Sequence, residues 1–300
     1  MRTPEGPRCS SISASLDEDI IGTASTVRAW ILLELSGPWG YDALVDNRMP
    51  PELSLALRAK ARAANARLVL LRRPGRQESG GGVCYLAHTG PRRSWLERLR
   101  LASPEDLLDV DLTHFDEGEP AQAGRIDRRP LYLVCTNGRR DPCCAERGRQ
   151  VAARLAEALG DRVWECTHIG GDRFAANIVC FPDGIYFGRV APDGALDIAR
   201  GYEDGLIDLD HYRGRSAYGF ATQAAETFLR RRHGLRGVDD LKLVGSRSGR
   251  DGAVKVAFAE PSGERLQITV RVSRAPAGRR LTCHSLDESN PPEYAAIYGS

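Results

Sequence analysis

The 300-residue sequence lacks any run of roughly eighteen apolar residues, the length with which a helix can cross a bilayer. Its start, Met1 to Gly6, also lacks the apolar core of a secretory signal. An excess of charge is absent too, because 42 Lys and Arg stand against 40 Asp and Glu. Such a balance gives no reason to expect nucleic acid or an anionic membrane as partner. We therefore expect a soluble, cytoplasmic protein that binds neither.

The sequence has no Cys-x-x-Cys motif, although it contains eight cysteines. Disulfide frameworks belong to small secreted domains in oxidising compartments, so metal or redox chemistry is the better expectation for some of these thiols. Free cysteine also serves as a small buried apolar residue. Cys84 and Cys180 lie inside apolar, strand-like runs. We assign both to the core.

Residues 1–124 show the order strand, helix, strand, strand. The patterns predict these elements at 29–35, 51–64, 67–71 and 82–86. We interpret Gly80-Gly81-Gly82 as the turn of a hairpin, since a phosphate-binding loop would need a following helix. The acidic segment 115–124 is rich in small residues and has no periodicity, which predicts a linker.

Residues 128–234 repeat that order more clearly. The predicted elements are a strand at 130–134, a helix at 143–159, a strand at 162–165, a hairpin at 178–187 and a closing helix at 221–229. Gly160 stands where a helix C-terminal cap belongs, and Pro182-Asp183-Gly184 is a turn sequence. Strand, helix, strand, loop, hairpin, helix is the order of a thioredoxin-like domain.

Residues 235–300 are expected to form an appended β-element. Apolar residues alternate in 254–258 and 266–272 on either side of Pro261-Ser262-Gly263, which predicts a β-hairpin. The expected fold is therefore α/β, with two thioredoxin-like units in tandem at 1–124 and 128–234, the second carrying the functional site, and a C-terminal β-hairpin element.

The chemistry-bearing residues gather around the second unit's first strand and helix. Cys135 follows the strand, Cys143 and Cys144 stand at the start of the helix, and Cys166 and His168 follow the next strand. In the proposed topology these positions converge at one edge of the domain. Thiolates select zinc or iron-sulfur clusters, and imidazole suits zinc or iron. A helix N-terminus favours ionised sulfur.

These motifs resemble the sucrase/ferredoxin-like family. The matching residues are Cys135-x8-Cys144 with Arg140-Asp141 between them, the run Cys166-Thr-His168-Ile-Gly-Gly, then Phe174-Ala175 and Asn177, and, near the start, Cys9, Gly22-Thr23-Ala24 and Gly37-Pro38-Trp39-Gly40. The resemblance covers most of the chain. It implies a thioredoxin-like 2Fe-2S ferredoxin as the second unit, and nothing about sugar hydrolysis.

Eukaryotic members of that family have Cys-x8-Cys followed by His-x3-His, two ligands to each iron. The resemblance therefore implies Cys135, Cys144 and His168 as cluster ligands, while Asp172 stands where the pattern has its second histidine. Either Asp172 or Cys166 could complete the set, or Asp172 could orient an imidazole without binding iron. Thiolate is the softer ligand, so we favour Cys166, with Asp172 as the alternative.

The predicted function is electron transfer by a 2Fe-2S cluster with mixed Cys and His ligation, as a carrier rather than an enzyme, between donor and acceptor proteins that the sequence does not identify. Two alternatives stay open. One is a thiol-redox enzyme with Cys135 or Cys144 as nucleophile. The other is a structural zinc module. Cys143 is expected to be a bystander, and Cys283-His284 is too short a motif to indicate a site.

Overall fold

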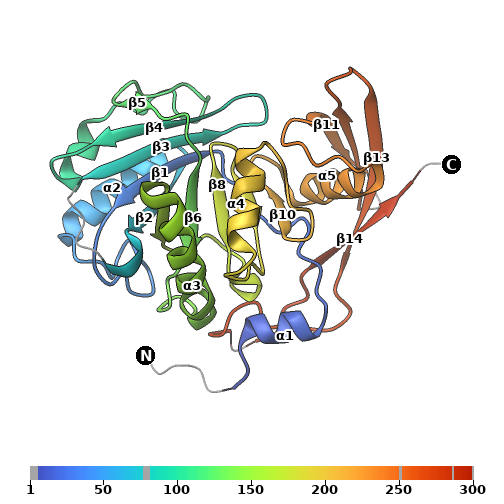
Figure 1. Ribbon diagram of the computed structural model, residues 1–300, viewed down its shortest axis with the longest axis horizontal. Coiled ribbons are helices and arrows are strands. Elements are labelled where there is room, and N and C mark those ends of the chain that lie inside the picture. Colours follow the sequence, from blue (N-terminus) through green and yellow to red (C-terminus); the bar gives the residue numbers. More distant parts are fainter. Residues whose placement is uncertain (1–5, 77–81, 250–251, 286, 299–300) are drawn as a thin grey trace.

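The computed structural model describes residues 6–76, 82–249, 252–285 and 287–298 as an α/β fold with two sheets (Figure 1). The larger sheet is curled and has ten strands in the order β10-β9-β8-β6-β7-β2-β1-β3-β4-β5. Its strands are β1 (Ala29–Glu34), β2 (Ala66–Arg72), β3 (Val83–Thr89), β4 (Ser94–Arg100), β5 (Arg125–Ile126), β6 (Leu131–Cys135), β7 (Val163–Cys166), β8 (Ile178–Phe181), β9 (Ile185–Phe187) and β10 (Tyr212–Arg215).

The smaller sheet is antiparallel and has the order β11-β12-β13-β14. These strands are β11 (Lys242–Ser248), β12 (Ala253–Ala259), β13 (Arg265–Arg274) and β14 (Pro292–Ile297). The α-helices are α1 (Cys9–Ser15), α2 (Pro51–Ala63), α3 (Pro142–Leu159), α4 (Ala195–Glu203) and α5 (Phe220–His233). The predicted C-terminal hairpin is confirmed as β12–β13 and forms the centre of this sheet.

Most of the predicted elements are confirmed, among them β1, α2, β6, α3, the β8–β9 hairpin and α5. Sequence patterns missed α1, α4, β4, β5, β10, β11 and β14, which are short or lack a clear apolar period. The predicted hairpin between β2 and β3 is wrong, because β1 lies between these two strands, parallel to β2 and antiparallel to β3. Gly80 and Gly81 of its turn lie outside the described residues.

The two predicted units share one continuous sheet. Strand β2 of the first pairs with β7 of the second, with Leu71 opposite Cys166 and Arg72 opposite Glu165. The segment after β4 belongs to the first half, because Phe115 is buried in that half's core and β5 extends the sheet beyond β4. The structure therefore shows a mixed α/β architecture in which the halves are joined strand to strand.

Alternation along the strands divides the core into layers. In β1, Ile31 and Leu33 pack with Leu57 of α2, whereas Trp30 and Leu32 face the opposite side. That opposite side packs against β6 and β7, so the curled sheet encloses an apolar layer between its halves. We call it the inner layer; its members include Trp30, Leu32, Leu131, Leu133, Trp164, Cys135, Cys144 and Cys166.

The outer face of the second half lies under α3 and α4. Tyr132 and Val134 of β6 pack there with Val151 and Leu155 of α3. Cys180 belongs to this layer and Cys84 to the layer under α2, both fully buried, which confirms the assignment of these two cysteines to the core.

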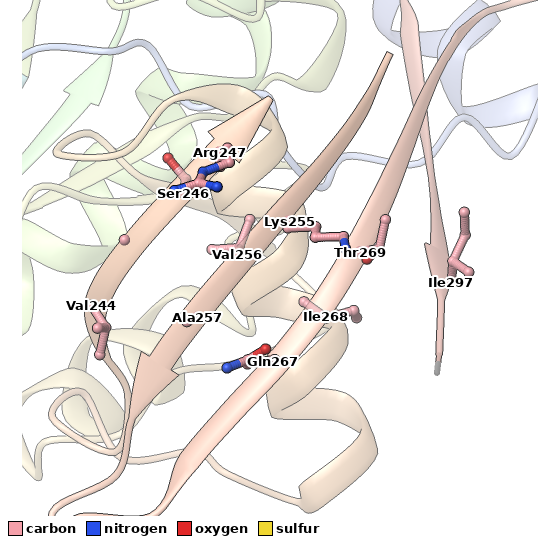
Figure 2. Close-up of a pocket in the computed structure, with 11 residues that line it drawn as sticks. Val244, Ser246, Arg247, Lys255, Val256, Ala257, Gln267, Ile268, Thr269 and Ile297 are labelled. Carbon is pink, nitrogen blue, oxygen red and sulfur yellow. The ribbon is translucent and has the colours of Figure 1, made fainter. Parts of the chain in front are cut away.

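Helix α5 covers one face of the smaller sheet, with Phe258 and Val270 buried beneath it. A shallow hollow of about 590 Å³ is lined by the strands of this sheet, among them residues of β11, β12 and β13 (Figure 2). Lys255, Gln267 and Thr269 contribute polar groups to it. Among the helices that the structure describes, none combines the length and the apolar character required to cross a membrane.

A buried ion pair secures the junction of the two halves. Arg72 Nη2 lies 2.6 Å from Glu165 Oε2, and Thr136 Oγ1 donates to the same oxygen at 2.8 Å. We predict that Glu165→Ala lowers the free energy of unfolding by about 3 kcal/mol, because it leaves the Arg72 guanidinium, only 13% exposed, without its carboxylate.

The matched control is Glu157→Ala, which breaks the exposed Arg154–Glu157 pair of α3. Exposed pairs contribute about 0 to 1 kcal/mol. Urea unfolding measures both variants. Equal losses in the two would show that the junction does not depend on this pair.

Candidate metal centre

The carboxyl ends of β6 and β7 bring two cysteines to the same edge of the sheet. These strands are parallel, and Cys135 is the register partner of Cys166. The chain then turns into α3, whose N-cap is Asp141, with Pro142 at the first helical position. Gly148 lets α3 lie against the strand, because a Cβ at this position would overlap the Cys135 carbonyl oxygen. The close packing sets Cys144 next to Cys135.

Cys135, Cys144, His168 and Asp172 form one group, here called the Cys135 group. The Cys144 side chain shares a hydrogen bond with Cys135, and its sulfur lies 3.3 Å from Asp172 Oδ1. The same carboxylate oxygen lies 2.9 Å from His168 Nδ1. Both cysteines and Asp172 are buried, whereas the His168 side chain is 29% exposed. The structure thus brings together three of the four favoured ligands, Cys135 of β6, Cys144 of α3 and His168 of the loop after β7, with Asp172, the alternative fourth ligand.

The two thiols of the Cys135 group differ in acidity. The hydrogen bond from Cys144 lowers the pKa of Cys135, whereas the same bond together with burial raises the pKa of Cys144 well above its usual value. The buried Arg213 guanidinium donates to the Asn177 side chain and to the Gly170 carbonyl of the loop that carries His168 and Asp172. A positive charge next to this loop favours an anionic occupant.

Cys166, the favoured fourth ligand, occupies a different position. It is fully buried in the inner layer beside Cys135, and burial raises the pKa of its thiol well above the usual value. The His168 ring contacts Asp172. Cys166 and Asp172 both lie near the proposed ligands and stay candidates for the fourth position. The described contacts, however, join Asp172, and not Cys166, to both Cys144 and His168.

The Cys135 group offers two pairs of possible metal ligands, Cys135 with Cys144 and His168 with Asp172. A cluster of two irons would need one such pair for each iron. His168 Nδ1 is buried and, although close to Asp172, makes no well-oriented hydrogen bond to the part of the chain that the structure describes. A buried ring nitrogen without such a bond is suited to bind a metal.

A second buried group could also hold a metal ion. It consists of Cys9, Asp141, Cys143 and Cys283, whose ligand atoms all lie within 4.8 Å of one another, and we call it the Cys143 group. Cys143, which we expected to take no part in the cluster site, belongs to this second group. Sequence reasoning missed this group because its members come from α1, the start of α3 and the segment between β13 and β14. No spacing rule relates residues so far apart.

Comparison with known proteins gives a family and three distant relatives. A family model described as Sucrase/ferredoxin-like matches residues 20–214. A protein of Meyerozyma guilliermondii called "Altered inheritance of mitochondria protein 32" is 31% identical over 97 residues, 28% of this chain and 34% of that protein. The protein of the same name from Saccharomyces kudriavzevii is 28% identical over 105 residues, 30% of this chain and 34% of that protein.

The match thus spans about a third of the length of these curated relatives. No solved structure matches the chain.

We predict that Gly148→Ala destabilises the protein by about 1 to 3 kcal/mol, because the added methyl group forces α3 away from the Cys135 carbonyl. The matched control is Gly201→Ala in α4, where a Cβ meets open space. That change should stabilise by about 0.5 to 1 kcal/mol through helix propensity. Chemical denaturation compares the two, and a stabilised Gly148→Ala variant would contradict the close contact.

Proposed function

The chain belongs to the sucrase/ferredoxin-like family, and from this premise we propose that it is a 2Fe-2S electron-transfer protein whose cluster is held by the Cys135 group. The observation that carries the proposal is the meeting of two buried thiols, a buried carboxylate and a partly exposed imidazole at the carboxyl ends of β6 and β7. Soft thiolates together with imidazole are a ligand set suited to iron.

Each residue of the group has a role in the proposal. Cys135 and Cys144 share a hydrogen bond and would bind one iron, and His168 would bind the other. The cluster supplies reversible one-electron transfer when bound, at a potential that imidazole ligation raises relative to an all-Cys centre. His168 is the partly exposed member of the group, so a redox partner would approach the cluster from the side of this ring.

Buried positive charge supports the same assignment. Arg213 is fully buried, and its Nη2 donates to the Thr23 carbonyl while its Nη1 holds the Asn177 side chain. Gly171, with φ +80°, passes so close to this guanidinium that a Cβ would overlap it. The loop that carries His168 and Asp172 is therefore packed against the Arg213 guanidinium. This positive charge would stabilise the negative charge of thiolate ligands.

For the fourth ligand, the contacts favour Asp172 over Cys166, the reverse of the preference drawn from ligand softness alone. Asp172 Oδ1 touches both the Cys144 sulfur and His168 Nδ1. Cys166 is enclosed in the inner layer beside Trp164. A carboxylate already placed between the Cys144 sulfur and the His168 ring needs little rearrangement to bind iron.

The partners are expected to be one electron-donor and one electron-acceptor protein. We place the protein in a reducing compartment such as the cytoplasm, where cysteines remain available to bind metals.

Replacement of either matched thiol tests the cluster. We predict that anaerobically purified protein is brown, with absorption above roughly 400 nm from sulfur-to-iron charge transfer. Cys135→Ser and Cys144→Ser should each lose most of the iron and the colour. Cys84→Ala and Cys180→Ala are the matched controls, because both thiols are equally buried but lie in other core layers.

The controls should keep iron at a packing cost of about 1 to 2 kcal/mol. A colourless wild-type protein with zinc in the Cys135 group would favour the zinc module, and a colourless protein without metal would favour the thiol-redox enzyme. Full iron in either serine variant would remove that cysteine from the ligand set.

The fourth ligand is tested by Asp172→Ala and Cys166→Ser. We expect Asp172→Ala to lose or reshape the electron paramagnetic resonance signal of the reduced cluster, because it removes the carboxylate next to His168. Cys166→Ser should leave the signal shape intact and shift only the midpoint potential. The opposite pattern would restore Cys166 as the ligand.

A further inference from the structure

The Cys143 group lies where both ends of the chain meet α3. Helix α1 carries Cys9, and the segment before β14 carries Cys283; in Figure 1 this segment passes beside α1. Asp141 and Cys143 belong to the start of α3. All four residues are buried. Cys9 and Cys283 are 274 positions apart in the sequence, yet their sulfurs are in contact.

The three sulfur atoms form a nearly equilateral triangle. Cys143 Sγ lies 3.6 Å from Cys9 Sγ and 3.4 Å from Cys283 Sγ, and the third side measures 3.5 Å. Three thiolates bound to one tetrahedral zinc ion at about 2.3 Å lie about 3.8 Å apart. The triangle is thus close to one face of a zinc tetrahedron. The same distances are far longer than a disulfide bond of about 2.05 Å.

Asp141 stands at the fourth corner. Its Oδ2 lies 3.6 Å from Cys9 Sγ, close to the roughly 3.5 Å expected between an oxygen and a sulfur bound to the same zinc ion. The carboxylate is held by two backbone donors, the N–H of Cys143 at 2.9 Å and the N–H of Cys283 at 2.6 Å. Each oxygen keeps a further lone pair for a metal.

Hydrogen-bond donors also surround the three sulfurs. The backbone N–H of Cys9 lies 3.4 Å from Cys283 Sγ, and Ser10 donates hydrogen bonds to the Cys143 sulfur. Arg147 in turn holds the Ser10 hydroxyl at 3.0 Å. If ionised, three buried sulfurs and a carboxylate this close together would need a cation to balance their negative charge.

We propose that the Cys143 group binds one zinc ion through Cys9, Cys143 and Cys283, with Asp141 in the fourth position. Because the three sulfurs all contact one another, they fit a single ion rather than the two separated pairs of a two-iron cluster. Four protein ligands close the coordination sphere, which is typical of a structural site. The ion ties α1 and the C-terminal segment to the start of α3.

This site is distinct from the Cys135 group but adjoins it. Cys143 and Cys144 are consecutive at the start of α3, and they direct one sulfur to each group. The zinc ion would therefore also steady the helix start that carries Cys144.

Metal analysis of the full-length protein tests the proposal. We expect one zinc per chain in addition to any iron. Cys9→Ala and Cys283→Ala should each reduce the zinc content at least tenfold while the iron stays, and Cys135→Ser should lose iron while zinc stays. Cys180→Ala, a buried cysteine of another layer, is the matched control and should keep both. The failure of one site is thereby distinguished from the failure of the other.

Cobalt gives a second measurement that needs no variant. Wild-type protein stripped of zinc by a chelator and titrated with Co²⁺ should show thiolate-to-cobalt charge transfer and the strong visible bands of a tetrahedral ion, and Zn²⁺ should abolish both. Zinc-free wild-type protein without a cobalt signal would overturn the proposal. So would undiminished zinc in both alanine variants, or a disulfide between two of the three cysteines in protein purified anaerobically.

Discussion

The cap at the start of α3 is the interaction on which both cysteine groups depend. The buried Asp141 carboxylate accepts a hydrogen bond from the backbone N–H of Cys143, and this bond fixes the first turn of the helix. It also accepts a hydrogen bond from the backbone N–H of Cys283, near the other end of the chain. With the first turn fixed, Cys143 and Cys144 must point in different directions, since neighbouring residues on a helix lie about 100° apart. One carboxylate thus orients proposed ligands of both sites.

The inner layer supplies the rigid support for this helix start. Trp30 of β1 stacks edge to face on Phe181 of β8, with ring centroids 5.2 Å apart, so the two halves of the curled sheet are packed on each other and not merely joined at β2–β7. Cys135 ends β6 within this layer. A ligand on a buried strand end is held more precisely than one on an exposed loop.

The two sites differ in the way that their proposed roles require. The Cys135 group includes a partly exposed imidazole, which an electron carrier needs because electrons must reach a partner protein. Every member of the Cys143 group is buried, as is suitable for an ion that only holds chain segments together. The thiols of both groups are buried, so the partly exposed His168 ring is the feature that distinguishes the proposed redox site from the proposed structural one.

The sequence by itself determined the local elements and the family. Strong periodicity gave β6, α3 and the β8–β9 hairpin, because a helix and a strand impose different repeats on their apolar residues. Only the tertiary structure decided which strands are neighbours and which distant residues meet. The β2–β3 error and the missed Cys143 group have this same cause: pairing across the sheet and contact between chain ends depend on packing, and packing leaves no periodic signal in the sequence.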